Sequence, residues 1–366
     1  MTAIAAVDAA AYTVPTDQPE ADGTLAWDAT TVVVASVRAD DITGVGWTYT
    51  SRAAAEVVRE LLAPAVIGGD PIDVTGCYEQ MVRAVRNVGR VGIAAAAVSA
   101  VDIAIWDLRA KLVQIPLAPL LGRVREHVPM YGSGGFTTYD DATMTAQLEG
   151  WLDDDGLRQV KIKIGEHWGS QSERDLARVR RAREVIGDRT ALFVDANGAY
   201  TAHQAVRLGR RMIDEAGIAW FEEPVSSDDL AGLREVRRHL PVDIAAGEYG
   251  DRESYFERML AADAVDCLQI DVTRCGGYTA WLRAAALAGA HNIEVSGHCA
   301  PNLHAPVAAA VPNLRHVELF HDHRRVDAAL FAGTLRVTDG YVTPQTDRPG
   351  HGMALKGVDA ERYRVD

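Results

Sequence analysis

From His127 onward, short apolar runs alternate with longer amphipathic stretches that are rich in arginine and alanine. Each apolar run predicts a β-strand, and each amphipathic stretch predicts a helix. The predicted strands cover residues 128–131, 160–164, 191–194, 218–221, 242–245, 267–270, 293–295 and 315–319. Eight strands separated by helices over roughly 200 residues fit a closed parallel barrel. An open doubly wound sheet is the alternative, but its GxGxxG phosphate fingerprint is missing.

The first 125 residues have a different pattern. Apolar and β-branched runs at residues 31–38 and 45–49 predict strands, and helical periodicity follows at residues 52–67 and 92–113. Residues 15–28, with two prolines and a glycine, predict a loop. After the barrel, residues 334–338 predict one more strand. The chain therefore divides into an α+β domain at residues 1–125, a barrel at 126–328 and a C-terminal segment at 329–366.

Composition and charge narrow the class of protein. The 366-residue chain is 48% hydrophobic and 24% charged, which is enough apolar sequence for a full core. Its net charge of −14 argues against a nucleic-acid-binding protein. The most apolar stretch, residues 91–106, contains Asp102 and is too short to span a bilayer. The N-terminus makes a poor signal peptide and the four cysteines lack CxxC spacing, so we expect a cytoplasmic protein with no membrane partner.

Ionisable residues stand at or just after the ends of six successive predicted strands. They are spaced 20 to 27 residues apart, about one βα unit: Asp195, Glu222, Glu248, Asp271, His298 and Glu318. The C-terminal ends of barrel strands form one mouth, where active sites are built. So many ionisable groups in one mouth would repel each other strongly without a counter-ion.

Three of these residues predict a metal site. Asp195, Glu222 and Glu248 offer oxygen ligands only, which suit Mg²⁺ better than Zn²⁺. Each carboxylate alone could instead cap a helix or pair with an arginine. The three together, at this spacing, favour the metal.

Only four of the 37 basic residues are lysines, and two of them, Lys161 and Lys163, lie two residues apart in one predicted strand. Residues at this spacing face the same side of a strand, so both amines point into the barrel. Neighbouring cations, and a divalent metal, lower the pKa of a lysine, which can then act as a neutral base. A half-exposed edge strand with solvated lysines is the alternative.

Asp271 and His298 fall on neighbouring predicted strands. A carboxylate that accepts from one ring nitrogen orients an imidazole and leaves the other nitrogen free for proton transfer. Glu318 could be a carboxylic acid held neutral to donate a hydrogen bond, or a partner of Arg315. The sequence HDHRR at residues 321–325 predicts a solvated turn.

The ordered motifs KIK, DANG, WFEEP, GE, DVTRCGG, SGH and VELF, with VDIAIWDLRAKL before them, resemble the mandelate racemase subgroup of the enolase superfamily, in its acid-sugar dehydratase-like branch. The resemblance covers nearly the whole chain. It implies an α/β fold with a modified (β/α)₇β TIM-like barrel and an N-terminal capping domain. It also implies that the C-terminal segment folds back onto the cap.

The resemblance also implies roles for the residues singled out above. Mg²⁺ would be held by Asp195, Glu222 and Glu248. The bases would be Lys163, with Lys161 beside it, and the His298–Asp271 dyad; Glu318 would donate a hydrogen bond to the intermediate. Arg274, in DVTRCGG, stands where muconate-lactonizing relatives carry a catalytic lysine, so that branch is less expected.

The expected reaction removes the proton next to a carboxylate and gives an enediolate. Loss of a β-hydroxyl would then dehydrate a sugar acid (an aldonate, uronate or aldarate) to a 2-keto-3-deoxy acid. Protonation of the opposite face would instead give a racemase or epimerase of a 2-hydroxy acid. A non-catalytic barrel that binds sugar acids is a third possibility, from a different class of protein.

Substrate contacts are expected in the capping loops, near residues 16–27 and 44–50. Asn197, Tyr49 and Trp47 are predicted to touch substrate, although Tyr49 and Trp47 could equally pack the cap against the barrel. The expected partner is a small carboxylate, and we expect a homo-oligomer, from dimer to octamer.

Overall fold

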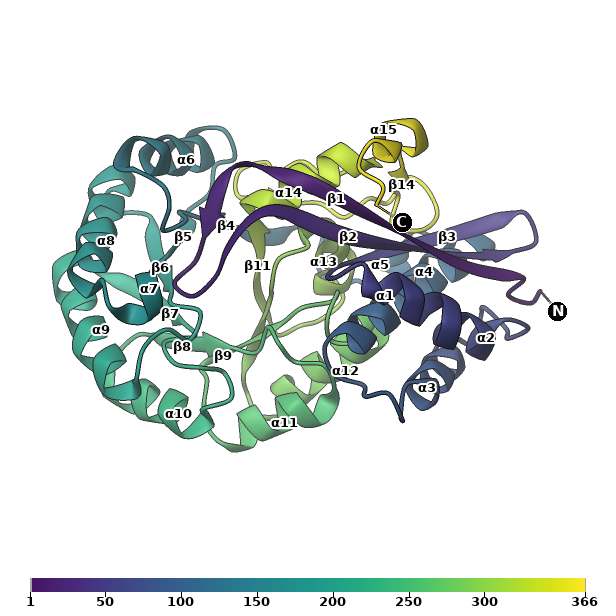
Figure 1. The fold of residues 1–366 in the computed structure, drawn as a ribbon, viewed down its shortest axis with the longest axis horizontal. Coiled ribbons are helices and arrows are strands. Elements are labelled where there is room, and N and C mark those ends of the chain that lie inside the picture. Colours follow the sequence, from purple (N-terminus) through teal and green to yellow (C-terminus); the bar gives the residue numbers. More distant parts are fainter. Residues whose placement is uncertain (1, 366) are drawn as a thin grey trace.

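A barrel of eight parallel strands forms the centre of the molecule (Figure 1). In the computed structural model, which describes residues 2–365, the strands follow one another in chain order, and β11 pairs with β4 to close the sheet. They are β4 (Val128–Gly134), β5 (Gln159–Lys163), β6 (Ala191–Asp195), β7 (Ile218–Glu222), β8 (Asp243–Ala246), β9 (Cys267–Ile270), β10 (Glu294–Gly297) and β11 (Leu314–Phe320). All eight predicted strands are confirmed, and closure excludes the open sheet.

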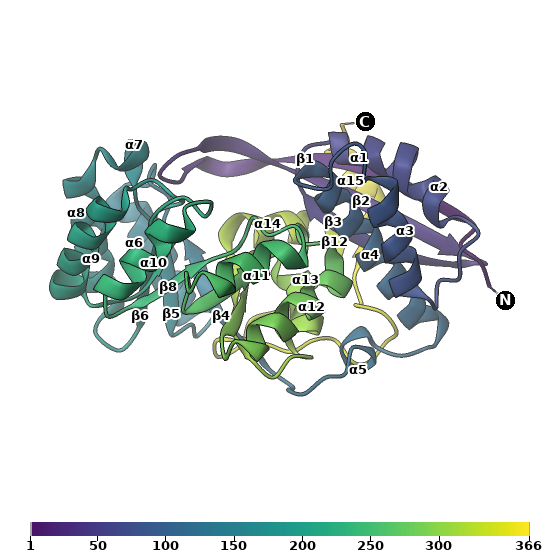
Figure 2. The ribbon, with the colours of Figure 1, turned by 90° about the horizontal axis from the view of Figure 1, so that it is seen from below.

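The helices that follow the strands cover the outside of the barrel (Figure 2). They are α6 (Asp141–Asp153), α7 (Glu166–Gly169), α8 (Ser172–Ile186), α9 (Ala202–Ala216), α10 (Leu230–His239), α11 (Glu253–Ala261), α12 (Gly277–Ala290), α13 (Pro301–Ala308) and α14 (His321–Leu330). Side-chain oxygens of Asp140, Thr201 and Asp229 accept from backbone N–H groups and cap α6, α9 and α10.

Helix α14 corrects one prediction. Residues 321–325 form its first turns rather than a solvated turn, and Asp322 and His323 are buried. Asp322 pairs with Arg325 and accepts a hydrogen bond from Thr30 of the capping domain. The cap therefore covers this helix, which a reading of local polarity could not show.

The N-terminal cap is an antiparallel sheet packed against helices. Its strands are β1 (Ala6–Ala21), β2 (Ala26–Ala39) and β3 (Ile42–Tyr49). Its helices are α1 (Ala53–Val57), a π-helical turn (Val58–Leu62), α2 (Ala63–Val66), α3 (Val74–Ala84), α4 (Ile93–Leu112) and α5 (Leu117–Leu120). The two predicted strands and both predicted helical regions of this domain are confirmed.

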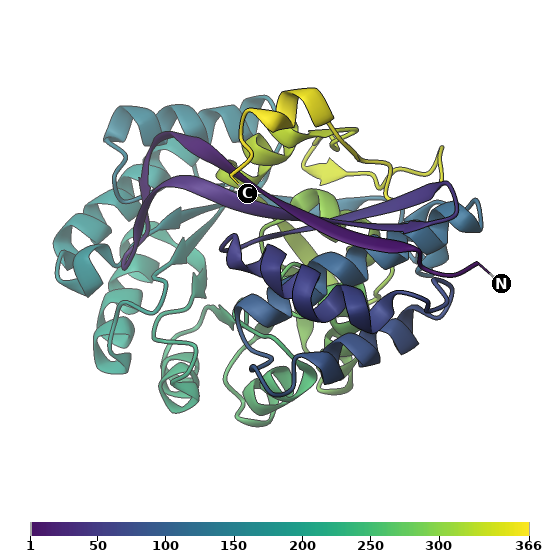
Figure 3. The same cartoon turned by 45° about the vertical axis from the view of Figure 1, so that its right-hand side comes forward.

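Strands β1 and β2 form a long hairpin that extends across the barrel mouth (Figure 3). The predicted loop at residues 15–28 is therefore wrong: only residues 22–25 form the turn, and Pro15 lies at the start of an irregular stretch of the ladder. The Asp22 side chain accepts from the N–H groups of Thr24 and Leu25 and fixes this turn. The hairpin tip reaches the loop after β5, where Trp168 N–H donates to the carbonyl of Gly23 at 2.9 Å.

Helix α4 of the cap also completes a barrel helix. No side chain of α12 caps its own N-terminus, but Asp102 accepts from Thr279 N–H at 3.0 Å and from the Thr279 hydroxyl at 2.6 Å. The Ser99 hydroxyl accepts from Gly276 N–H at 2.8 Å. Gly277 has φ +77°, and a Cβ there would lie 2.4 Å from the Asp102 carboxylate, so this contact requires glycine. Cap and barrel thus share one helix terminus.

The C-terminal segment returns to the cap. It contains β12 (Phe331–Ala332), β13 (Tyr341–Val342), β14 (Ala354–Leu355) and α15 (Gly357–Glu361). The predicted strand at residues 334–338 is wrong, since Thr338 makes only an isolated bridge to Tyr341. Thr13 N–H donates to the carbonyl of Tyr363 at 2.8 Å, and His351 N–H donates to Asp107 of α4 at 3.0 Å. The domain boundaries given above remain predictions.

Within residues 2–365, none of the helices combines the length and the apolar character needed to cross a bilayer. The four cysteines are free and buried.

Glu20, at the far end of the β1–β2 hairpin, is an acidic residue in an apolar setting. Its side chain is 1% exposed, and Trp27 Nε1–H donates to one carboxylate oxygen at 2.8 Å. The other oxygen has no hydrogen-bond partner among the described residues. Burial, and secondly the charge of Asp322, raise the pKa of Glu20 to about 8.

Replacing this group should change how stability depends on pH. Native Glu20 keeps its proton above the ordinary value of 4.5, so its contribution to stability is present below that pH and is lost as the pH rises to about 8. We expect the unfolding midpoint of Glu20→Gln, relative to the wild type, to rise steadily across this window. Denaturant titrations of both proteins test this, and a difference that does not change with pH would contradict it.

Candidate active site

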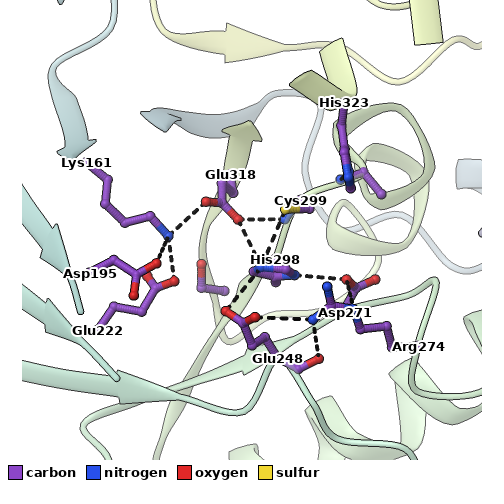
Figure 4. Close-up of polar contacts among 12 residues, drawn as sticks. Lys161, Asp195, Glu222, Glu248, Asp271, Arg274, His298, Cys299, Glu318 and His323 are labelled. Atoms are coloured by element: carbon purple, nitrogen blue, oxygen red, sulfur yellow. Dashed lines mark hydrogen bonds and ion pairs between the residues drawn. The ribbon is translucent and has the colours of Figure 1, made fainter. Parts of the chain in front are cut away.

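The strand ends place the predicted site residues in one barrel mouth (Figure 4). Lys163 is in register with Asp195 on β6, which is in register with Glu222 on β7. Because parallel strands in register point equivalent side chains the same way, these three lie at one level of the barrel. Lys161 lies one layer deeper. Of the remaining site residues, Glu248 follows β8, Asp271 follows β9, His298 follows β10 and Glu318 stands on β11.

Asp195, Glu222 and Glu248 form a buried carboxylate cluster. One oxygen from each lies within 4.8 Å of the others, and all three residues are buried. Gly247, at φ +133°, lets the chain turn here, since a Cβ would lie 2.3 Å from the backbone oxygen of Gln269. Burial and the adjacent Asp195 raise the pKa of Glu222 to about 8. A buried cluster of carboxylate oxygens fits a hard divalent cation.

Both lysines are buried among these carboxylates. Lys161 Nζ lies 2.5 Å from Glu222 and 2.8 Å from Glu318, and Lys163 Nζ lies 2.5 Å from Asp195. Burial disfavours the charged amine of Lys163, but Asp195 outweighs it and holds the pKa above its ordinary value. Without a metal, the nearest carboxylate therefore controls this lysine, and the expected lowering of its pKa by Lys161 does not prevail.

The predicted dyad is present. Asp271 lies 2.8 Å from Nδ1 of His298, and the other oxygen of Asp271 accepts from the N–H and the hydroxyl of Thr273, both at 2.7 Å. Nε2 of His298 lies 3.2 Å from Glu248. Burial alone would lower the pKa of His298, but Cys299, Glu248 and the other acids around it outweigh burial and raise it well above its ordinary value.

Glu318 acts as an acceptor in this arrangement. Its Oε2 accepts from Cys299 N–H at 2.7 Å and its Oε1 lies 2.8 Å from Lys161. Burial would raise the pKa of Glu318, but Lys161 and His298 hold it well below its ordinary value. The ligand-free site therefore favours the carboxylate over the neutral acid that the sequence predicted.

Arg274 links the two halves of the site, a role that the sequence did not reveal. Nη1 lies 3.2 Å from Glu248 and Nε lies 3.4 Å from Asp271. The guanidinium also lies over the ring of Tyr249, 5.3 Å from its centre. One side chain thus fixes a carboxylate of the cluster relative to the dyad.

A cavity of about 220 Å³ opens onto these groups. The hairpin contributes Asp22, Leu25 and Trp27 to its wall, and the barrel contributes Lys163, Asn197, Glu248, Arg274, His298 and Cys299. Asn197 therefore lies where a substrate contact is expected.

The structure does not bring Trp47 and Tyr49 to this cavity. Trp47 is fully buried and stacks on Phe331 at 4.0 Å between ring centres. The Tyr49 hydroxyl donates to Asp327 of α14 at 2.5 Å, and its ring stacks on His323. Tyr49 therefore joins the cap to the barrel, as the alternative interpretation of the sequence expected, whereas Trp47 joins the cap to the C-terminal segment.

Two family models match the chain. Residues 14–122 match the mandelate racemase/muconate lactonizing enzyme N-terminal domain, and residues 143–360 match the enolase C-terminal domain-like family. The chain is 32% identical to the L-talarate/galactarate dehydratase of Salmonella typhimurium, over 88% of this chain and 80% of that protein. It is 34% identical to the 3,6-anhydro-α-L-galactonate cycloisomerase of Streptomyces coelicolor, over 86% of each.

Other curated relatives are named arabinonate, D-gluconate and L-rhamnonate dehydratases. Among solved structures, a mandelate racemase/muconate lactonizing enzyme-like protein from Rubrobacter xylanophilus superposes with a TM-score of 0.96 at 45% identity, over 99% of this chain and 100% of that one. A racemase from Streptomyces coelicolor, solved with bound magnesium, gives 0.92 at 31% identity, over 99% and 100%. The chain therefore belongs to the mandelate racemase subgroup of the enolase superfamily.

Proposed function

We propose that this enzyme uses magnesium to dehydrate a sugar acid to a 2-keto-3-deoxy acid. The observation that carries the proposal is the arrangement around one cavity: a lysine from β5, a His–Asp dyad that follows β9 and β10, and a three-carboxylate cluster with them. A positioned base alone contributes roughly 10²–10⁴-fold, so the reaction of a weak carbon acid also needs charge stabilisation.

Asp195, Glu222 and Glu248 would hold the metal. Their buried carboxylate oxygens match the ligands that magnesium prefers, and similar structures were solved with magnesium bound. Bound there, magnesium supplies the positive charge that stabilises an enediolate.

Lys163 is the proposed base for the α-proton. Its amine lines the cavity, and its ion-pair partner Asp195 is also a proposed metal ligand. A divalent ion and the lysine would therefore compete for the same carboxylate, and a buried amine that loses its counter-charge favours the neutral form. Lys161, paired with Glu318, would keep its charge and donate hydrogen bonds to the substrate carboxylate.

His298 is the proposed acid that protonates the departing hydroxyl. Its Nδ1 lies 2.8 Å from Asp271, so Nε2 is the nitrogen that would pass the proton, and Cys299, Glu248 and the other surrounding acids hold the imidazole in its charged form. A residue that holds a proton before the reaction suits elimination. Racemisation, the alternative, requires His298 to remove a proton as well.

The substrate class comes from the relatives, which are named for galactarate, arabinonate, gluconate and rhamnonate. We propose that the substrate is an aldonic or aldaric acid. Location in the cytoplasm and homo-oligomeric assembly remain predictions.

Incubation with Mg²⁺ and a library of aldonic, uronic and aldaric acids should yield a 2-keto-3-deoxy acid from at least one member. A racemised or epimerised product with no keto acid would overturn the dehydratase assignment.

Lys163→Ala should remove the first chemical step. We expect exchange of the α-proton with D₂O, followed by NMR on the substrate found above, to fall by about 10²–10⁴-fold. Lys356→Ala is the matched control, since this lysine lies in the C-terminal segment and donates to the carbonyl of Ala328. If Lys163→Ala exchanges the α-proton at the wild-type rate, Lys163 is not the base, and either another residue removes the proton or the barrel is non-catalytic.

His298→Asn should separate the two steps. Because Lys163 comes from β5 and is a separate proposed base, proton exchange should persist while keto-acid formation falls by about 10²–10⁴-fold. Parallel NMR and keto-acid assays on one sample measure this ratio. Loss of both signals to the same extent would mean that His298, and not Lys163, removes the α-proton.

A further inference from the structure

A second ligand-like group lies beside the carboxylate cluster and contains sulfur. His298 Nε2 lies 3.4 Å from Cys299 Sγ and 3.7 Å from Glu318 Oε2, and the ligand atoms of all three residues lie within 4.8 Å of one another. All three residues are more than nine-tenths buried. His298 and Cys299 also line the cavity, so an ion has a route of entry.

The three donor atoms are fixed in place before any ion binds. Asp271 holds Nδ1 of His298, and Lys161 holds the opposite oxygen of Glu318, so that Nε2 and Oε2 both lie near the sulfur of Cys299. Nε2 also lies 3.2 Å from Glu248. Cys299 has φ +52° and the next residue, Ala300, has φ +40°, a conformation that costs energy for residues other than glycine. The hydrogen bond from Cys299 N–H to Glu318 holds this strained turn.

The chemistry of these atoms and the two separations measured from His298 Nε2, 3.4 Å to sulfur and 3.7 Å to oxygen, fit a tetrahedral zinc site. Zinc lies about 2.0–2.3 Å from nitrogen, oxygen and sulfur ligands, so neighbouring ligand atoms are separated by roughly 3.3–3.8 Å. Nitrogen and sulfur donors favour zinc over magnesium. A histidine that ligates a metal commonly donates its other N–H to a carboxylate, as His298 can to Asp271.

We propose that His298, Cys299 and Glu318 bind a thiophilic divalent cation such as Zn²⁺, at a site that adjoins the three-carboxylate cluster. On binding, the thiol proton of Cys299 and the Nε2 proton of the charged His298 pass to solvent as the metal–sulfur and metal–nitrogen bonds form. The thiolate and the Glu318 carboxylate then balance the two positive charges. The ion occupies Nε2 of His298 and blocks its proton transfer. This inhibition rests on the proposed function, whereas the binding does not.

Cobalt tests the binding directly, because Co²⁺ replaces Zn²⁺ and gives a near-ultraviolet charge-transfer band when thiolate is a ligand. With Mg²⁺ in excess, one equivalent of CoCl₂ should produce this band in the wild type, and ZnCl₂ should remove it. Cys299→Ser should lack the band and bind Zn²⁺ more than about tenfold more weakly. Cys77→Ser, a buried cysteine of the cap, is the matched control and should keep the band.

Further measurements keep the two proposals distinguishable. Asp195→Asn, which alters the carboxylate cluster, should retain the cobalt band. Loss of the band in Asp195→Asn, or its presence in Cys299→Ser, would overturn the proposed zinc site. If circular dichroism shows that Cys299→Ser is unfolded, anomalous diffraction at the zinc edge from wild-type crystals tests the site instead. The absence of an anomalous peak beside Cys299 would then overturn the proposal. Inhibition of α-proton exchange by Zn²⁺, weaker in Cys299→Ser, is measured only where exchange itself is found.

Discussion

The balance of buried charge at the barrel mouth is the constraint on which the rest of the structure depends. Five carboxylates, Asp195, Glu222, Glu248, Asp271 and Glu318, share one buried region with two lysines, an arginine and a histidine. Charges removed from water are tolerated only when they are paired closely. Each strand end must therefore be placed to within a hydrogen-bond length, and the closed barrel supplies that rigidity. The five acids outnumber the four basic groups, and the cluster of three offers oxygen ligands only, which suits a divalent cation.

Most of the barrel followed from the sequence because its information is local and repeated. A parallel strand that is buried on both faces appears in the sequence as an apolar run. Functional side chains stand at the ends of these runs, as Asp195 does at the end of β6 and Glu222 at the end of β7. Strand β1 and the start of β2 were missed for the opposite reason. They contain alanine, proline and acidic residues, and Pro15 and Glu20 are held there by pairing with Ala29 and Trp27 across the hairpin, while Thr138 of the barrel donates to the carbonyl of Pro19. Such tertiary support leaves no periodic signal.

The same distinction applies within the site. Spacing alone brought the lysines, the dyad and the carboxylates together, since those positions are fixed by strand register. The direction of the pKa of Lys163 was not predictable, because it depends on whether Asp195 or Lys161 lies nearer. Arg274 and Cys299 stand on loops after the strands, and their contacts depend on turns that sequence patterns do not specify. Tyr49 looked like a substrate contact because only the packed cap shows that its hydroxyl is taken by Asp327.

The helix terminus shared by Ser99, Asp102 and α12 bears on how such enzymes can be recombined. Because the cap supplies hydrogen-bond acceptors that the barrel helix lacks, the two domains are not interchangeable modules. A chimera that grafts the cap of one relative onto the barrel of another, to exchange substrate preference, must therefore combine a cap that carries this serine and aspartate on α4 with a barrel that carries the glycine pair they contact. Without them, the new cap would leave α12 with open N–H groups in a dry interface, so specificity and folding are inherited together.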